Sequence, residues 1–449
     1  MPTKPLVKVL DIIETLAVLS SQFSATNLRT FASIVESILS VSGSVTTLSV
    51  SRMSEVSYRT VQRFYALKSL DWLTIRLLLF RAFVYDPTHQ YLLVGDETVE
   101  DKAGSHTYGV SRFYSSLYKQ AINSVSFLAF SLLDVSTHRS SLIGCGQLIK
   151  DSATKPVVEK ATPSPKRAKG RPKGSKNKPK AESSSLSYQS LKSLLLLLQT
   201  QLRRLLPDLK CFHLVLDGFY GHQAYLLLAL EHKLQIVSKF KSTAHLQLPF
   251  EGSYAGVGRP KTKGKKVNPE KIPQLYWKQT QQEKNSPLLT HLYQLQAYTP
   301  KMSGQLLNVV ILVHINTTTR KQATTILFTN DLTLTAQQII HYYSLRFQIE
   351  FDFRDAKQFF GLSSFKNYKA TQVTNAVNLA FTMTLISRIL LEKYQTRCKC
   401  PTMGIWDMKT LCRVQKYVKS TLKCDNLDPD DLLTNLQFLN IVRLEAIHI

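Results

Sequence analysis

Long apolar runs are missing from this chain. The two most apolar stretches, at 191–206 and 375–391, are interrupted by polar residues before they reach the roughly 20 residues that span a bilayer. The first residues, MPTKPLVKVLDIIETLAVLSSQFS, are amphipathic and carry acids, so we expect no cleavable leader. A membrane role is therefore not expected.

Cysteine is also scarce. Six cysteines in 449 residues are too few for a disulfide framework. Cys398 and Cys400, with Cys412 and Cys424 further along, suggest zinc, but their spacing fits no common zinc site. We expect reduced thiols in a cytoplasmic protein.

Acidic residues are few compared with basic ones. The chain has 31 Asp and Glu against 57 Lys and Arg, which gives a net charge of +26. Such an excess predicts a polyanionic partner, either nucleic acid or an anionic membrane surface. Because 44% of the residues are hydrophobic, the charge belongs to a folded protein, and the length predicts two or three domains.

Basic residues are concentrated in a segment that cannot form a core. Residues 150–185 are rich in lysine, arginine and proline, so we expect a disordered basic loop. Within it, KGRPKG (169–174), with Arg171 and Lys173, resembles an AT-hook, which lays arginine in the minor groove of A·T-rich DNA. GRPK (258–261), with Arg259, partly repeats it. A generic phosphate-binding segment is the alternative, and both interpretations predict DNA nearby.

The N-terminal region has apolar residues at helical intervals, so residues 1–80 should be all-helical. A short helix, a turn at 54–57 and a second helix beginning near Tyr58 fit a helix-turn-helix, with Arg59 and Arg63 near the exposed start of the second helix. A plain helical bundle is the alternative. The pattern by itself does not separate the two.

Two short apolar runs each end on an aspartate. The first run covers 91–95 and ends at Asp96, and the second covers 211–216 and ends at Asp217. A buried strand that delivers an acid at its end is a common way to place a metal ligand, although it is also a common structural feature.

One long helix is predicted over 339–362, with a capping box formed by Thr335 and Gln338 and a stop at Gly361. At 100° per residue, one polar stripe of roughly 80° contains five residues of interest. They are Tyr343, Arg346, Glu350, Arg354 and Lys357. A solvated charged face is the simple explanation, and a metal ligand beside phosphate-binding donors is the functional one.

The intervals within this stripe carry a family resemblance. From Tyr343 to Lys357 they match the signature Y-(2)-R-(3)-E-(6)-K without a gap. The chain thus resembles the DDE transposases of bacterial insertion sequences, in the YREK-bearing subgroup (insertion-sequence family four). Asp96-Glu97-Thr98 resembles the first-aspartate motif of that family, with Glu in place of its usual second aspartate, and Asp217 fits the second aspartate.

The resemblance implies an α/β fold in which a ribonuclease-H-like mixed sheet is flanked by helices. It also implies that Asp96, Asp217 and Glu350 are catalytic and hold two Mg²⁺ ions, for which Mn²⁺ can substitute. Cleavage at the element ends and strand transfer into target DNA would follow. Double-stranded DNA, as terminal inverted repeats and target, would be the partner of a homodimer. The DNA contacts would include Tyr343, Arg346, Arg354 and Lys357.

We expect the domains to follow the composition shifts. They are a helical DNA-binding domain at 1–80, the first part of the core at 83–244, a β-rich insertion with a return strand at 245–330, the final core helices at 331–395 and a helical C-terminal region at 396–449. The bacterial cytoplasm, in association with the nucleoid, is the expected location. Two alternatives remain open. One is a non-catalytic DNA-binding regulator or domesticated transposase, and the other is a ribonuclease-H-like nuclease that cuts without joining.

Overall fold

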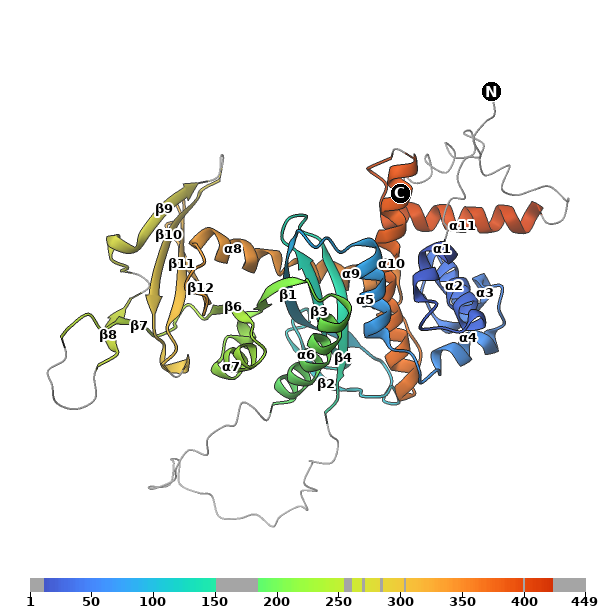
Figure 1. Cartoon of the computed structure of the whole chain (residues 1–449), viewed down its shortest axis with the longest axis horizontal. Helices are drawn as coiled ribbons and strands as arrows, with labels where there is room; N and C mark the ends of the chain where they lie inside the picture. The colour runs from blue at the N-terminus through green and yellow to red at the C-terminus, as the bar shows by residue number, and fades with distance from the viewer. Residues whose placement is uncertain are drawn as a thin grey trace, which may run out of the picture.

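A computed structural model gives the fold (Figure 1). It describes residues 12–150, 185–253, 261–268, 271–282, 286–302, 304–398 and 400–422.

The centre of the protein is a mixed sheet with the strand order β4-β3-β1-β5-β6. Strand β3 runs antiparallel to both β4 and β1, whereas β1, β5 and β6 run parallel to one another. The strands are β1 (Gln90–Asp101), β3 (Gln120–Asp134), β4 (Ser140–Leu148), β5 (Lys210–Leu216) and β6 (Gln235–Phe240). This is a ribonuclease-H-like arrangement, and the predicted fold class is confirmed. The short β2 (Ser111–Ser115) pairs with β3 and forms a hairpin with it.

The strands expected as a β-rich insertion continue this same sheet. Strand β12 pairs with β6, and β11, β10 and β9 follow in antiparallel order, so the sheet has ten strands. Their bounds are β9 (Trp277–Gln282), β10 (Leu288–Ala297), β11 (Leu307–Asn316) and β12 (Gln322–Thr329). A separate two-stranded sheet is formed by β7 (Leu246–Pro249) and β8 (Lys263–Val267). Figure 1 shows this extension to the left of the core.

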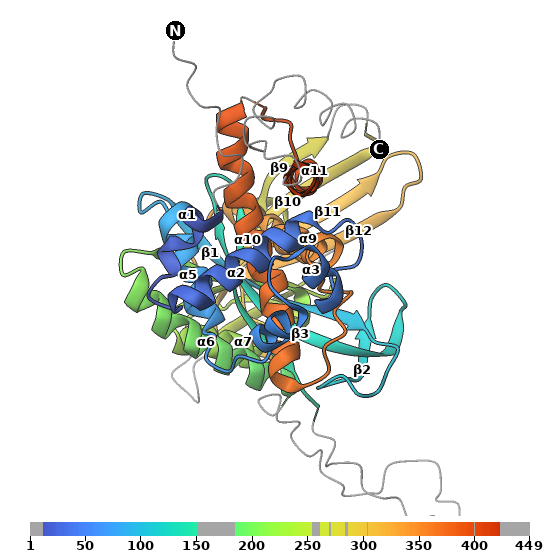
Figure 2. The same ribbon diagram turned by 90° about the vertical axis from the view of Figure 1, so that its right-hand side faces the viewer.

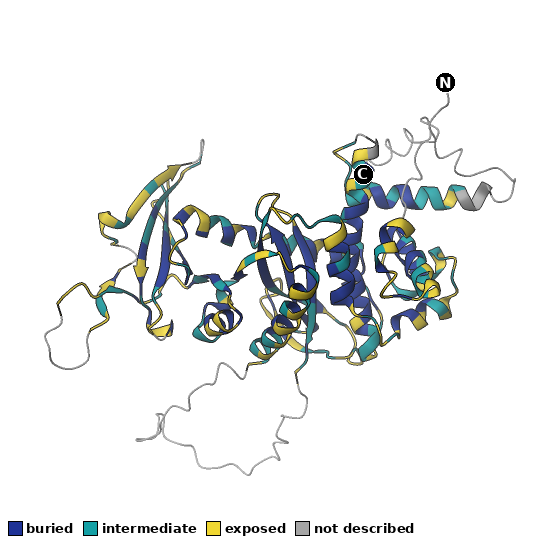
Figure 3. Cartoon of the chain, in the orientation of Figure 1, coloured by how far each residue is buried: buried dark blue, intermediate teal, exposed yellow. Residues whose placement is uncertain are grey.

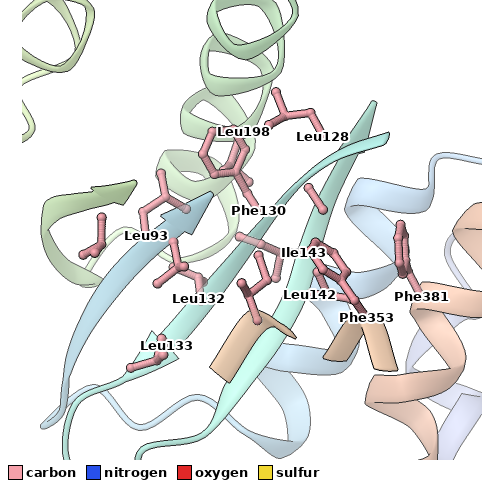
Figure 4. Packing of buried hydrophobic residues seen from close by; sticks show 14 of the residues in the cluster. Leu93, Leu128, Phe130, Leu132, Leu133, Leu142, Ile143, Leu198, Phe353 and Phe381 are labelled. Carbon is pink, nitrogen blue, oxygen red and sulfur yellow. The ribbon is translucent and has the colours of Figure 1, made fainter. Parts of the chain in front are cut away.

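Helices cover both faces of the core sheet. Helix α6 (Leu186–Leu205) packs against β3 and β4, while α9 (Gln348–Phe359) packs against β1 and β4. Figure 4 shows Leu198 of α6 on one side of the strands and Phe353 of α9 on the other. The ring of Phe353 lies 5.9 Å from that of Phe381 in α10 (Ala370–Cys398). Figure 3 shows the buried residues in dark blue, in the core strands and in the helices that pack beside them.

Among the described residues, one helix is long and apolar enough to span a membrane. It is α10, over Ala370–Thr396, and 89% of its apolar window is buried inside the protein. Such burial is typical of a core helix. The apolar surface of α10 is covered by α5 (Trp72–Phe83), α9 and β4, as Figures 1 and 2 show.

The N-terminal helices form a compact group beside α10 (Figure 2). They are α1 (Ile12–Leu16), α2 (Ala25–Ser40), α3 (Thr47–Met53) and α4 (Tyr58–Tyr65). A buried asparagine of α10, Asn375, links these helices to the core. It accepts a 2.8 Å hydrogen bond from Trp72 Nε1 and donates hydrogen bonds to the carbonyls of Tyr65 and Leu67. α11 (Ile405–Leu422) packs on α2. α7 (Gln223–Glu231) lies beside β6.

The helix expected over 339–362 is two helices, so that prediction is wrong in one respect. α8 (Ala336–Leu345) ends before Arg346, and α9 begins at Gln348. Backbone bonds across the junction span three residues instead of four, from Arg346 N to Tyr343 O (3.3 Å) and from Glu350 N to Phe347 O (3.1 Å). The tighter turn divides the helix without glycine or proline, because Arg346 and Phe347 both keep right-handed helical backbone angles. The capping box of Thr335 and the stop at Gly361, where φ is 90°, are confirmed.

Candidate active site

The sheet places two aspartates side by side. In the parallel pairing of β1 and β5, Gly95 is the partner of Leu216, so the next residue of each strand is an aspartate: Asp96 and Asp217. A Cβ atom at position 95 would lie 2.7 Å from the ring of Phe130 and 2.8 Å from Leu216, so only glycine fits here. The apolar run predicted that the strand ends at Asp96, and this is wrong. β1 continues to Asp101 because β3 still pairs with it.

The third acid arrives on a helix. Glu350 lies in the first turn of α9, which packs against β1 and β4. We call Asp96, Asp217 and Glu350 the acidic triad. The first two come from neighbouring strands and the third from the helix across that end of the sheet, so residues far apart in the chain meet at one place.

A single guanidinium joins the triad. Arg346 Nη1 lies 2.6 Å from Asp96 Oδ2, while its Nη2 lies 3.1 Å from Glu350 Oε1 and 3.9 Å from Asp217 Oδ1. Tyr343 donates a 3.3 Å hydrogen bond from its hydroxyl to Asp217 Oδ1. The side chains of Asp96 and Arg346 are 19% and 13% exposed, whereas those of Asp217 and Glu350 are 45% and 39% exposed. The site is therefore closed at Asp96 and open toward the other two acids.

Burial and crowding of like charges alter the acidity of these groups. Burial raises the pKa of Asp96 to about 6; the Arg346 cation opposes this, and the nearby Asp217 and Glu350 add to it. Burial lowers the pKa of Arg346, but the surrounding acids outweigh that effect and leave it raised, so the guanidinium stays charged. Burial, followed by the charge of Asp217, raises the pKa of Tyr343 to about 12, so its hydroxyl remains a donor.

The donor set suits a divalent cation, although the side chains are not arranged as a ready-made cage. Within the described ranges, no group of three or more His, Cys, Asp or Glu side chains is placed to hold a metal ion. The three carboxylates lie instead against Arg346, whose buried Nε has no hydrogen-bond partner. Carboxylate oxygens are the ligands that Mg²⁺ prefers. The triad thus converges on a cation, and in this state that cation is the guanidinium.

The two remaining basic residues of the stripe lie further along α9. Lys357 Nζ is 2.7 Å from Glu100 Oε1 of β1. Arg354 lies over the ring of Phe351, with 4.8 Å between its guanidinium carbon and the ring centroid, and its Nη2 is 3.4 Å from Asp355 Oδ1. The side chain of Arg354 is 61% exposed. Arg354 is therefore open to a ligand, whereas Lys357 is held by an acid.

A cleft of about 850 Å³ begins at two members of the triad and extends between α9, β1 and the β2–β3 hairpin. Asp96 and Glu350 lie in its wall, and Tyr114 and Tyr118 of the hairpin line the opposite part. Both tyrosines are more than half exposed. Sequence reasoning did not identify the hairpin as part of the site, because aromatic residues in a short exposed strand carry no distinctive spacing.

Two acids of β1 also gained partners that the sequence did not reveal. Glu97 accepts a 2.8 Å hydrogen bond from the hydroxyl of Tyr220, which follows Asp217 closely in the chain. Glu100 pairs with Lys357 and is 3% exposed. The alternation of a strand from Asp96 would have placed Glu100 on the same face, so a signal for it was present.

The other predicted DNA contacts lie elsewhere. Arg59 and Arg63 are exposed on α4, whose preceding helix α3 and intervening turn have the expected order. Both helices are capped by side chains, Thr46 for α3 and Ser57 for α4. Arg171, Lys173 and Arg259 lie outside the described residues.

Comparison with known proteins adds a family to this geometry. The family model of the DDE superfamily endonucleases matches residues 18–296, which is more than half of the chain and includes Asp96 and Asp217. No curated protein matches. With the ribonuclease-H-like sheet, the match shows that this chain belongs to the DDE superfamily endonuclease family, whose substrate is DNA.

Proposed function

We propose that the protein is the transposase of a bacterial insertion sequence, of the YREK-bearing subgroup. It would cleave DNA at the ends of its element and transfer the strands into target DNA by a cut-and-paste reaction. One observation carries the proposal: the acidic triad meets around the arginine of the YREK spacing, between a strand pair and a helix. Residues of this kind have no structural need to converge on an open cleft.

The triad would hold the metal ions. Two divalent cations, Mg²⁺ or Mn²⁺ in its place, would activate the attacking oxygen and stabilise the leaving oxygen at phosphorus. Asp96 is the most enclosed of the three ligands, so it would fix the position of the site, while Asp217 and Glu350 are more exposed. The hydroxyl of Tyr343 would orient Asp217 through the hydrogen bond that it donates.

Arg346 would act in two states. One guanidinium carries a single positive charge against the three acids of the triad, so the site keeps an excess of negative charge that attracts divalent cations. With metal ions held by the triad, the Nη1 and Nη2 donors of the guanidinium would be available to phosphate oxygens, whereas Nε is buried. Arg354 and Lys357, on the same helix, would bind neighbouring phosphates.

The rest of the chain would bind DNA away from the scissile bond. The net charge of +26 supports a large phosphate-binding surface. The α3–α4 pair, with Arg59 and Arg63, would read the terminal inverted repeats, and the basic segments with Arg171, Lys173 and Arg259 would hold flanking or target DNA. The domain division at 1–80, 83–244, 245–330, 331–395 and 396–449 is part of this proposal. So are a homodimeric synaptic complex and a location at the bacterial nucleoid.

The test uses the full chain and a plasmid that carries the DNA flanking its coding region. With Mg²⁺, the wild type should nick the plasmid at the element ends and join a labelled end to target DNA. Asp217→Ala and Glu350→Ala should abolish cleavage and still bind DNA. Glu392→Ala is the matched control, because Glu392 is an exposed acid paired only with Arg139 among its described ion pairs.

The outcomes separate the alternatives. Full cleavage by either triad variant would overturn the assignment of the active site. Sequence-specific binding without nicking by the wild type would indicate a DNA-binding regulator or domesticated transposase. Nicking without strand transfer would indicate a nuclease of the same fold.

A further inference from the structure

A buried acid holds the last residue of the YREK spacing. Glu100 Oε1 lies 2.7 Å from Lys357 Nζ, and the side chains are 3% and 36% exposed. Glu100 Oε2 accepts a 2.6 Å hydrogen bond from Ser363 Oγ, so both carboxylate oxygens are engaged. A carboxylate this deeply buried requires a partner, because leaving it unpaired would be strongly unfavourable. The Lys357 ammonium is therefore held by Glu100 on one side and remains partly exposed to solvent.

This ion pair repeats the geometry of the triad one step along the cleft. Asp96 and Glu100 are four residues apart on β1 and so face the same side of the strand. Glu350 and Lys357 are seven residues apart, which is about two helical turns, on α9. All four residues line the same cleft. Strand and helix are thus bridged by charged side chains at two levels, first by Arg346 and then by the Glu100–Lys357 pair.

The loop after α9 holds Glu100 from behind. Ser363 belongs to this loop, and Lys102 of the segment after β1 donates a 3.2 Å hydrogen bond to the carbonyl of Phe365. The ammonium of Lys102 also lies 3.4 Å from the centroid of the Phe365 ring. The loop is thus held to Glu100 and to Lys102, and the hydrogen bond from Ser363 restrains the Glu100 carboxylate.

An acid beside a DNA-binding lysine lowers the affinity for DNA, so the position of Glu100 needs an explanation. A lysine side chain has four rotatable bonds and loses conformational entropy when it binds a phosphate. A fixed acid removes that cost in advance, as in the ion pair with which protein kinases hold their phosphate-binding lysine. The contact is an ion pair without hydrogen-bond geometry, since Glu100 Oε1 has no hydrogen-bond partner, so the N–H donors of the ammonium remain available to the cleft.

We propose that Glu100 is a positioning residue that fixes the Lys357 ammonium for a phosphate of the DNA strand being cut. The proposal rests on the proposed function and deepens it. Lys357 would bind the phosphate beside the scissile one, and Glu100 would act only through Lys357.

Charge alone and positioning predict opposite results for Glu100→Gln. This substitution removes a negative charge from a cleft that binds DNA, so charge alone predicts equal or tighter binding and unchanged cleavage. Positioning predicts that the cleavage rate at saturating DNA falls at least tenfold while KM does not rise. Asp101→Asn is the matched control, because it removes an equal charge from the next residue of β1, which lines the same cleft but is exposed. It should cleave like the wild type.

A double variant tests whether the acid acts through the lysine. Lys357→Met should be slow, and adding Glu100→Gln should slow it no further. If Glu100 were purely structural, Glu100→Gln would lower the cleavage rate in proportion to the fraction of folded protein measured by thermal unfolding. The loss would then be the same in the wild type and in Lys357→Met. If Glu100→Gln does not fold, Ser363→Ala replaces it, because this change frees Glu100 while keeping every charge; a loss of cleavage in the same direction is expected.

The salt dependence of DNA binding provides a measurement that does not need cleavage. A lysine that contacts one phosphate contributes about 0.9 to the slope of log K against log salt concentration. Lys357→Met and Glu100→Gln should both reduce the slope by up to this amount, and Asp101→Asn should not. A wild type that binds but never cuts would contradict the proposed function and leave this comparison valid. Wild-type cleavage and slope in Glu100→Gln would overturn the positioning role alone.

Discussion

Arg346 Nη1 and Asp96 Oδ2 lie 2.6 Å apart although 250 positions separate the two residues in the chain. The contact joins the first strand of the core to the junction between α8 and α9. Because the same guanidinium also contacts Glu350, it organises the site before any metal ion or DNA arrives.

Replacing Arg346 with Met should destabilise the metal-free protein. The change leaves the largely buried Asp96 without its cation, and breaking a buried pair in this way costs about 3 kcal/mol. Thermal unfolding in EDTA would measure the loss. Added Mg²⁺ should then raise Tm more in Arg346→Met than in the wild type, because the triad no longer has a competing cation. Equal Mg²⁺ effects on the two proteins would contradict a shared cation position.

The raised pKa of Asp96 predicts a pH-dependent stability of definite sign. Between pH 4 and about 6 the folded protein keeps the Asp96 proton that the unfolded chain releases. The stabilisation that protonated Asp96 gives the folded state is therefore full below about pH 4 and is lost as pH rises through about 6. Without metal, the free energy of unfolding of the wild type relative to Asp96→Asn should fall over this window by an amount on the order of 3 kcal/mol. Denaturant unfolding at several pH values would measure it. Parallel pH profiles for the two proteins would show that the pKa is not raised.

Gly361 should not tolerate a side chain. Its φ is 90°, and a Cβ atom would lie 2.9 Å from both Cβ and the carbonyl oxygen of Val45. Gly361→Ala should therefore lower the free energy of unfolding by about 2 kcal/mol or more. Gly304→Ala is the control, because φ is 82° there and nothing lies within 4 Å of the added atom. Similar losses in both variants would mean that backbone strain, rather than contact with Val45, accounts for the effect.

Asn375 should be important for holding the N-terminal helices on α10. Asn375→Ala removes three hydrogen bonds and leaves the buried Trp72 Nε1 and the Tyr65 and Leu67 carbonyls without this partner. The expected loss in the free energy of unfolding is about 3 kcal/mol. Trp72→Phe removes only one of these bonds, so it should cost less. A larger loss in Trp72→Phe would show that packing of the indole ring outweighs the hydrogen bonds.

The fold class could be predicted because local patterns and fold agree over most of the core. The apolar runs before Asp96 and Asp217 are strands, and the register of β1 with β5 explains why both acids lie at one place. The family match supports the endonuclease class, and the roles of the individual site residues stay predictions.

The features that could not be predicted depend on long-range contacts. The sequence at Arg346 and Phe347 contains no residue that breaks a helix. The acids that hold Arg346 at this junction come from β1 and α9, so they are not visible in the local sequence. The strands from 277 to 329 have ordinary patterns, which do not tell a separate domain from an extension of the core sheet. The partner of Lys357 was signalled only indirectly, because strand alternation from Asp96 places Glu100 on the same face but Glu100 has no motif of its own.

The order of the elements along the chain determines when the site is completed during synthesis, because β12, which pairs with β6, precedes α8 and α9. The ribosome makes Asp96 and Asp217 early, but α8 follows directly after β12, so Arg346 and Glu350 are delivered only after the outer strands have been made. A nascent chain therefore carries two of the three acids for a long interval without the third or its counter-charge. The site therefore stays without its helix-borne acid until the outer strands β9 to β12 have been made.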